Sequence, residues 1–220
     1  MKESIKQEKA LVLTTVDLLR NIEDQLFLFL RLFLEELELF ECEEMIIYAI
    51  RELAANANKA NMKRLYFLEK NLDINNKEHY EIGMSSFKDD TFVDLDRYGR
   101  QLSEQGLYVK FSFHVKNDNF TITIMNNTAL SHEEETRIND KISKAWDFHS
   151  MAEAMSHILD GTEGAGLGIV SIIMMLRKIG ISDRNALKIR KKTGETHSIV
   201  RIPYKSPQIG IPTPSLVEVL

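Results

Sequence analysis

Cysteine is nearly absent from the sequence, since Cys42 is the only one among 220 residues. One thiol excludes an intramolecular disulfide and any metal site built from several cysteines, and it fits a reducing compartment. No excess of positive charge is present either, because 28 Lys and Arg stand against 33 Asp and Glu and leave a net charge of −5. This balance gives no support to broad electrostatic binding of nucleic acid or anionic lipid.

Long hydrophobic runs are also missing. The most apolar stretch, residues 26–34, is interrupted by Arg31 and flanked by glutamates, so it is too short and too charged to span a bilayer. The first residues, MKESIKQEKA, lack the apolar core and cleavage site of a signal peptide. We therefore expect a cytoplasmic protein without membrane or nucleic-acid partners.

The apolar periodicity predicts helices and strands that are grouped along the chain. Helices are expected at 4–20, 22–40, 45–61, 87–105, 131–145, 149–159 and 169–180. Strands are expected at 64–69, 107–115, 120–126, 186–192 and 196–203, with a hairpin turn at 116–119. Helices first and antiparallel strands later indicate an α+β fold, a two-layer α/β sandwich with extra N-terminal helices.

Three regions follow from this grouping. Residues 1–40 are N-terminal helices for packing or dimerisation, and residues 41–205 are the main domain, with a polar insertion at 71–105. Residues 206–220 are an extended tail. The helix at 22–40 is apolar almost all round, so it is either buried in the core or part of a homodimer contact.

The first segment with chemical character is ELAANANK, residues 52–59, on the helix at 45–61. Glu52 and Asn56 are four residues apart and share one face of that helix. Asparagine is a mediocre helix former, so its recurrence at 56, 58 and 61 is unusual for a mere solvated edge.

The second such segment is the loop GTEGAGLG, residues 161–168. Closely spaced glycines let backbone N–H groups approach phosphate oxygens, and the apolar helix that follows adds its positive N-terminal end. The spacing is not that of a Walker motif. The loop also follows a helix, not the first strand of a βαβ unit, which disfavours a dinucleotide fold.

Together the two segments resemble the GHKL superfamily, which contains histidine kinases, anti-sigma-factor serine kinases, type II topoisomerases and heat-shock chaperones. Residues 52–59 look like its N-box, and GAGLGI, residues 164–169, looks like the glycine box beside its ATP lid. The resemblance covers about residues 40–203 and implies the Bergerat ATP-binding fold, with ATP and Mg²⁺ as ligands.

The resemblance implies a role for each matching position. Asn56 would coordinate Mg²⁺ through its side-chain oxygen, Lys59 would lie near the phosphates, and Glu52 would be the general base of a catalytic member. The nucleotide-binding positions implied in this way are Asn56, Lys59, Asn126, Gly161, Gly164, Gly166, Leu167 and Gly168.

The sequence departs from the family pattern after the strand at 120–126. Where the family has Asp-x-Gly, this chain has Asn126, Asn127 and Thr128. The family's aspartate accepts a hydrogen bond from the adenine amino group, and Asn126 can accept one only through a neutral amide oxygen. Thr128 in place of glycine stiffens the loop. The departure favours, as an alternative, a degenerate module without catalysis.

The branch of the superfamily is indicated by what surrounds the N-box. All six histidines follow residue 59, so no phosphoacceptor histidine lies on an N-terminal helix, and none forms a His-x-x-x-His metal pair. The layout at 25–61 resembles the anti-sigma-factor serine kinases. The implied function is an ATP-Mg-binding signalling regulator, either a protein serine/threonine kinase or an anti-sigma-like protein that binds a partner. The alternatives are a non-catalytic module acting through protein–protein contacts and the ATP-binding half of a split histidine kinase.

Overall fold

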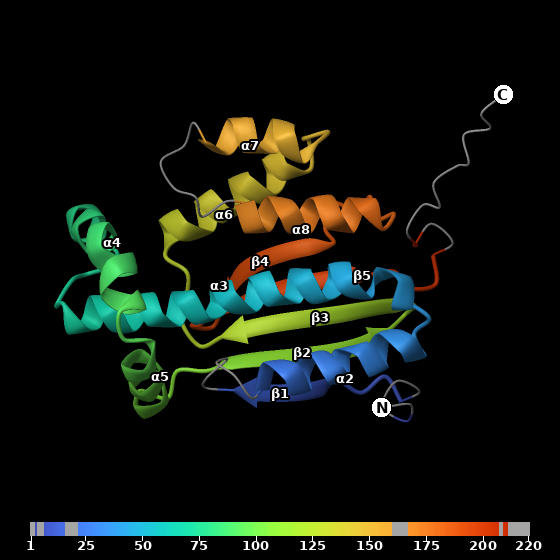
Figure 1. Ribbon diagram of the computed structural model, residues 1–220, viewed down its shortest axis with the longest axis horizontal. Helices are drawn as coiled ribbons and strands as arrows, with labels where there is room; N and C mark the ends of the chain where they lie inside the picture. The colour runs from blue at the N-terminus through green and yellow to red at the C-terminus, as the bar shows by residue number, and fades with distance from the viewer. Residues whose placement is uncertain (1–2, 4–6, 16–21, 160–166, 207–208, 211–220) are drawn as a thin grey trace.

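A computed structural model describes residues 3, 7–15, 22–159, 167–206 and 209–210 of the chain (Figure 1). The strands are β1 (Leu11–Thr15), β2 (Val109–Lys116), β3 (Asn119–Asn126), β4 (Leu187–Lys192) and β5 (Glu195–Ile202). The helices are α2 (Ile22–Glu36), the short 3₁₀ helix η1 (Phe40–Cys42), α3 (Glu43–Glu69), α4 (Lys77–Phe92), α5 (Leu95–Glu104), α6 (His132–Ala145), α7 (Met151–Leu159) and α8 (Leu167–Lys178).

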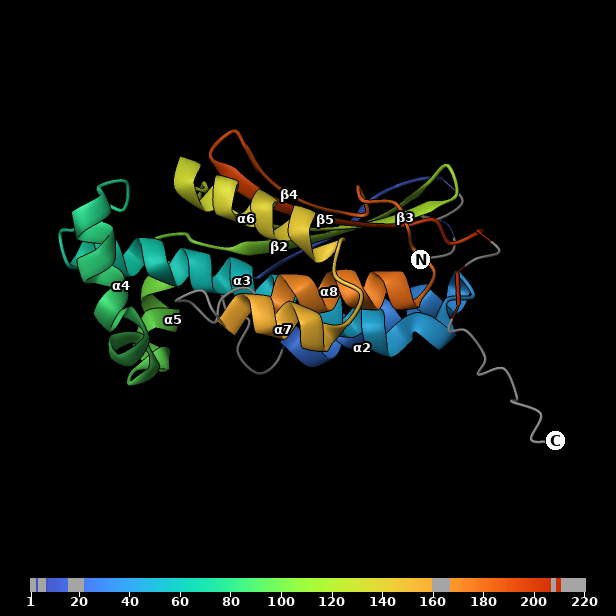
Figure 2. The same ribbon diagram turned by 90° about the horizontal axis from the view of Figure 1, so that it is seen from above.

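The five strands form one sheet in the order β1-β2-β3-β5-β4, and every neighbouring pair is antiparallel. Figure 2 shows α2, α3 and α8 together on one side of this sheet. The predicted α+β class and two-layer α/β sandwich are therefore confirmed. None of the helices in the described part of the chain is both long and apolar enough to cross a membrane.

Strict alternation in β2 and β3 points every second side chain at the helical layer. Phe111 and Phe113 on β2 and Ile122 and Ile124 on β3 are almost fully buried, while the residues between them are half-exposed. The turn that joins the two strands has positive φ at Asn117 and Asp118, as two-residue hairpin turns require. The predicted hairpin is therefore confirmed.

The helix predicted at 4–20 is wrong for residues 11–15, which form the edge strand β1. This strand pairs with β2, for example Leu13 with Phe111. Val12 and Leu13 are both exposed, so the apolar spacing of this segment does not mark a buried helical face. The open edge of β2 supplies backbone hydrogen bonds, and β-branched Val12, Thr14 and Thr15 suit a strand. Residues 4–6 and 16–20 lie outside the described residues.

The strand predicted at 64–69 is also wrong, because these residues are the last turns of α3. Arg64 donates hydrogen bonds to the carbonyl oxygen of Ala129 at 2.7 Å and to Glu134 at 2.6 Å. Tyr66 and Phe67 are buried against the helices that follow. These long-range contacts decide between helix and strand for a segment whose short apolar pattern suits either.

The polar insertion at 71–105 folds as two helices, α4 and α5, where one helix at 87–105 was expected. Asp94 separates them, since its side chain accepts a hydrogen bond from the N–H of Arg97 and caps α5. Asn76 caps α4 in the same way. The insertion and the end of α3 enclose a second small core made of Leu65, Tyr66, Phe67, Phe87, Tyr98 and Leu102.

Candidate functional site

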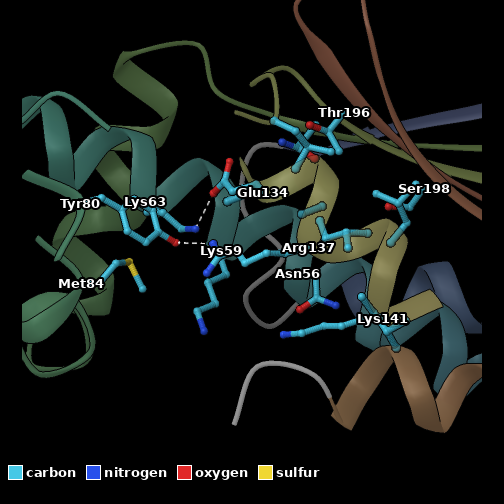
Figure 3. A pocket seen from close by; sticks show the side chains of 17 residues that line it. Asn56, Lys59, Lys63, Tyr80, Met84, Glu134, Arg137, Lys141, Thr196 and Ser198 are labelled. Carbon is cyan, nitrogen blue, oxygen red and sulfur yellow. Dashed lines mark hydrogen bonds and ion pairs between the residues drawn. The ribbon is translucent and has the colours of Figure 1, made fainter. Parts of the chain in front are cut away.

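A cavity of about 160 Å³ lies between α3, α6, one end of α4 and the ends of β3 and β5. Figure 3 shows side chains from α3, α4 and α6 entering it from different sides. The residues that line it are Asn56, Ala57, Lys59, Ala60, Lys63, Tyr80, Met84, Asn126, Leu130, Glu134, Arg137, Ile138, Lys141, Ile169, Ile189, Thr196 and Ser198. Three predicted site residues, Asn56, Lys59 and Asn126, are thus brought together from two distant segments.

Asn126 and Thr196 form the floor of the cavity and belong to a buried network of four polar side chains. The Nδ2 group of Asn126 donates to Thr128 Oγ1 at 2.7 Å and lies 3.3 Å from Asn61 Oδ1. Thr128 Oγ1 donates to the same Asn61 oxygen at 2.9 Å, and Asn61 Nδ2 donates to the carbonyl oxygen of Tyr108 at 3.0 Å. Thr196, which pairs with Asn126 across the sheet, donates to the carbonyl oxygen of Thr128 at 2.7 Å. The network fixes the orientation of Asn126.

The remaining polar atom of Asn126 is its Oδ1. Asn126 is only 2% exposed and lines the cavity, and this oxygen accepts no hydrogen bond from any residue that the structure describes. Among the described residues, the fully buried side-chain atoms without a partner are Arg64 Nη1 and Trp146 Nε1, so this oxygen lies at the surface of the cavity. The floor therefore presents one fixed acceptor to whatever occupies the cavity.

An ion-paired cluster forms one wall. Glu134, at the start of α6, accepts from Lys63 Nζ and from Arg64 Nη2, both at 2.6 Å. Burial by itself would raise the pKa of Glu134, but the two cations outweigh that effect and lower the pKa to about 2. Glu134 is therefore ionised at neutral pH and joins α6 to α3 beside the cavity.

The other end of the cavity is open. Asn56 and Lys59 are exposed on α3, and neither has a hydrogen bond or ion pair within the described parts of the chain. Lys141 and Arg137 enter from α6 on the facing side (Figure 3). The guanidinium of Arg137 reaches the hydroxyl of Tyr80 at the far end of the cavity, so the cations at this opening are Lys59 and Lys141, which favour an anionic ligand.

Glu52 lies one turn before Asn56 on α3 and meets the start of α8. A Cβ placed on Gly168 would stand 3.5 Å from Cδ of Glu52 and would overlap its Oε2. Leu167 and Gly168 form the first turn of the twelve-residue α8, and Ile169 lines the cavity. The two segments singled out in the sequence are thus in contact at Glu52 and Gly168. Gly161, Gly164 and Gly166 lie outside the described residues.

Several residues of the site were not predicted from the sequence. The sequence marks Asn61 only as an unusual helical asparagine, and Thr128 only as a replacement for glycine. Nothing in the local pattern marked Tyr80 and Met84, which lie in the insertion, or the cavity residues Lys63, Glu134, Arg137, Lys141 and Thr196. A capping-box pattern at Ser131 and Glu134 could have indicated the start of α6, but not the partners of Glu134.

A divalent cation fits this site only together with a ligand. Among the described residues, no group of three or more His, Cys, Asp or Glu side chains could hold a metal ion. Mg²⁺, however, is commonly bound through one or two protein oxygens, several waters and substrate phosphates. The side-chain oxygen of Asn56 suits that mode, since it is exposed at the cationic opening.

No protein-family model matches the sequence, and no solved structure matches it. The chain is similar to an uncharacterized protein of Treponema pallidum (strain Nichols), with 34% identity over 183 residues. The similar region covers 83% of this chain and 36% of that protein, so the chain spans about a third of its relative's length. The relative's name states neither a ligand nor a reaction and assigns no function to this chain.

Proposed function

We propose that the cavity binds ATP with Mg²⁺, and that the chain is a signalling regulator of the GHKL type. The observation that carries the proposal is the contact between Glu52 and Gly168, which joins the N-box-like segment to the glycine-box-like segment next to Asn56 and Ile169, two residues that line the cavity. The two segments at which the sequence resembles the family are thus in contact, and Asn56 and Ile169, one from each, line the cavity together with Asn126.

The buried end suits the adenine base. The free Oδ1 of Asn126 is an acceptor for the exocyclic amino group of adenine, and it is held in place by Thr128 and Asn61. The network replaces the aspartate of the family pattern with a neutral acceptor of fixed direction. The lost charge weakens the hydrogen bond, and the fixed orientation offsets part of that loss.

The open end suits the phosphates. Asn56 precedes Asn61 by five residues on α3, which corresponds to roughly 7.5 Å along the helix axis. The cations Lys59 and Lys141 and the N-terminal turn of α8 lie toward this end. The enclosed volume of about 160 Å³ is below the roughly 300–1,000 Å³ of typical small-molecule sites. It therefore holds only part of a nucleotide, and the phosphates extend over Asn56 and Lys59.

Glu52 is the proposed general base. Its carboxylate is half-buried beside Gly168 and has no hydrogen-bond partner among the described residues. In phosphoryl transfer, the bond from the γ-phosphorus to ADP breaks and a bond to the acceptor oxygen forms, while Glu52 takes the acceptor's proton. Bound Mg²⁺ would neutralise part of the phosphate charge. The acceptor is a Ser or Thr hydroxyl of a partner protein, or water.

A non-catalytic module is the second candidate, and the replaced Asp-x-Gly favours it. In this alternative the cavity holds nucleotide without turnover, or holds none, and the chain acts by binding a partner protein. The ATP-binding half of a split histidine kinase is a third possibility. It shares the nucleotide site and differs only in the acceptor.

Isothermal titration of the purified chain with a non-hydrolysable ATP analogue, with and without Mg²⁺, tests the proposal. We expect micromolar binding that needs Mg²⁺, and its loss in Asn56→Ala. Asn58→Ala is the matched control, because Asn58 lies on the same helix but does not line the cavity. No binding at millimolar nucleotide, or an unchanged affinity in Asn56→Ala, would refute the site.

Turnover is tested separately by the release of labelled phosphate from ATP. Glu52→Gln should keep nucleotide affinity and lose phosphate release. Glu44→Gln, in the exposed first turn of the same helix, should keep both. Binding without any release by the wild-type chain supports the non-catalytic candidate.

A further inference from the structure

We propose that α4 of the insertion forms the end wall of the base-binding end of the cavity, and that Tyr80 and Met84 contact the purine ring and select adenine. This inference rests on the proposed nucleotide function and adds to it a subsite that the N-box and glycine-box segments do not contain. Figure 3 shows both side chains at one end of the cavity, beyond Lys63, with Asn56 and Lys141 toward the other end.

The position of this wall follows from the spacing on α4. Tyr80, Gly83 and Met84 are three and four residues apart, so they share one face of the helix. Gly83 is buried, and a Cβ there would stand 2.5 Å from Cζ of Phe67 on α3. The missing side chain lets α4 approach α3 closely. The rings of Phe67 and Tyr80 lie 5.9 Å apart, so the close contact seats Tyr80 against α3.

Tyr80 is also tied to the opposite wall. Arg137 Nη2 on α6 donates to the Tyr80 hydroxyl at 2.9 Å. Lys63 Nζ and Arg137 Cζ each lie 5.5 Å from the centroid of the ring. Groups from three helices therefore contact the Tyr80 side chain and hold it at the cavity. Its hydroxyl hydrogen stays available as a donor, because the Tyr80 oxygen only accepts in these contacts.

The hydroxyl hydrogen of Tyr80 is the donor that complements Asn126. Its oxygen accepts from Arg137, and its O–H finds no acceptor among the residues that the structure describes. Adenine offers an amino donor and ring-nitrogen acceptors, so it suits one acceptor, Asn126 Oδ1, and one donor, Tyr80 O–H. Guanine carries a carbonyl oxygen where adenine carries the amino group, and that oxygen would face Asn126 Oδ1 without a hydrogen between them.

Met84 supplies the apolar part of the wall. Its flexible thioether is suited to contact with the face or edge of an aromatic ring. Leu130, Ile138 and Ile189 line the same cavity, so a base would meet these apolar side chains as well as the polar groups of Asn126 and Tyr80. This composition is typical of sites that bind planar ligands.

The test is isothermal titration with three probes in the presence of Mg²⁺: a non-hydrolysable ATP analogue, the matching GTP analogue and inorganic tripolyphosphate. The variants are Tyr80→Phe and Met84→Ala. Ile82→Ala is the matched control, because Ile82 lies on α4, is 53% exposed and does not line the cavity. Tyr80→Phe keeps the ring, so it preserves the packing against Phe67.

We expect Met84→Ala to weaken binding of the ATP analogue about tenfold. Tyr80→Phe should weaken it about fivefold and should reduce the ratio of the affinity for the ATP analogue to that for the GTP analogue. Tripolyphosphate, which has no base, should bind both variants as it binds the wild-type chain, and Ile82→Ala should match the wild type throughout.

Two results would overturn this inference while leaving the nucleotide site intact. One is wild-type ATP affinity in both variants. The other is an equal loss of affinity for the ATP analogue and for tripolyphosphate, which would mean that the residues do not contact the base. Failure of the wild-type chain to bind any of the three probes would instead remove the proposed function itself.

Discussion

The Glu52 carboxylate occupies the space that a side chain at Gly168 would need. The contact joins the middle of α3 to the first turn of α8, and it brings the carboxylate to the positive end of a helix. Only glycine at position 168 leaves this carboxylate where it is. The requirement for glycine here is therefore one of space, because the backbone at Gly168 is helical.

A double-mutant cycle between Gly168 and Glu52 tests this contact. In the Glu52→Ala background, Gly168→Ala should stabilise the chain by up to about 1 kcal/mol, because alanine is the better helix former. In the wild-type background the displaced carboxylate should offset that gain. Urea denaturation of the four proteins measures the coupling. The contact is refuted if Gly168→Ala has the same effect in both backgrounds.

Glu134 makes the free energy of unfolding depend on pH in the acidic range. Its pKa is lowered to about 2 in the folded protein from 4.5, so its contribution is complete above pH 4.5 and is lost as the pH falls toward 2. The difference between these values corresponds to an upper limit of ~3 kcal/mol at neutral pH. Glu134→Gln should lose about that much stability at pH 7 because it leaves Lys63 and Arg64 without their partner.

The difference in the free energy of unfolding between the wild-type chain and Glu134→Gln should fall, by pH 3, to less than half of its value at pH 7. Urea denaturation at several pH values measures this difference. Asp183→Asn is the control, since the pKa of Asp183 is also lowered, by the backbone N–H of Asn185, but its carboxylate lies in an exposed turn and forms no ion pair with Lys63 or Arg64. A gap that stays constant from pH 7 to pH 3 would show that Lys63 and Arg64 do not hold Glu134 ionised.

Alternation and turn chemistry made most of the sheet predictable. The buried side chains of β2 and β3 recur with the period of a strand, and Asn117 and Asp118 suit a hairpin turn, so both features follow from local sequence. The segment at 64–69 could not be assigned in this way. Its state depends on Glu134 and Ala129, which lie far along the chain.

The residues of the candidate site also divide into those that local sequence predicts and those that depend on tertiary contacts. Glu52 and Asn56 were predictable because helical spacing alone places them on one face. Asn61 and Thr196 were not, since their roles depend on which strands become neighbours and in which register. The position of Tyr80 could not be predicted either, because it depends on the close approach of α4 to α3 at Gly83. Local patterns thus identify the residues that the family resemblance contains and miss those that the tertiary packing adds.

Asn126→Asp should destabilise the chain, although it restores the residue type of the family pattern. The amide of Asn126 donates to Thr128 and faces Asn61 Oδ1, and a carboxylate there would place oxygens against oxygens in a buried network. We expect a loss of about 1–3 kcal/mol in the free energy of unfolding. Asn127→Asp is the control. It keeps the acceptor for the N–H of Tyr108 and loses the donor to the carbonyl oxygen of Gly106, but Asn127 is only half-buried, so water reaches the new carboxylate and the loss should be smaller. Equal stability of Asn126→Asp and the wild type would contradict the hydrogen-bond network.

Helix α2 presents two faces with different expected roles. Leu30 is fully buried in the main core, while Leu28 and Leu32 are 60% and 48% exposed. Leu30→Ala should lower the free energy of unfolding by about 2–5 kcal/mol, whereas Leu28→Ala should change it by less than about 0.5 kcal/mol.

The exposed position Leu28 also tests whether α2 takes part in a dimer. Light scattering of Leu28→Asp reports the molar mass, and the substitution leaves the core undisturbed. A wild-type dimer that becomes monomeric in Leu28→Asp would show that the exposed face of α2 is a subunit contact. An unchanged molar mass would leave α2 as a core helix whose apolar character is explained by Leu26, Leu30, Phe33 and Leu34 alone.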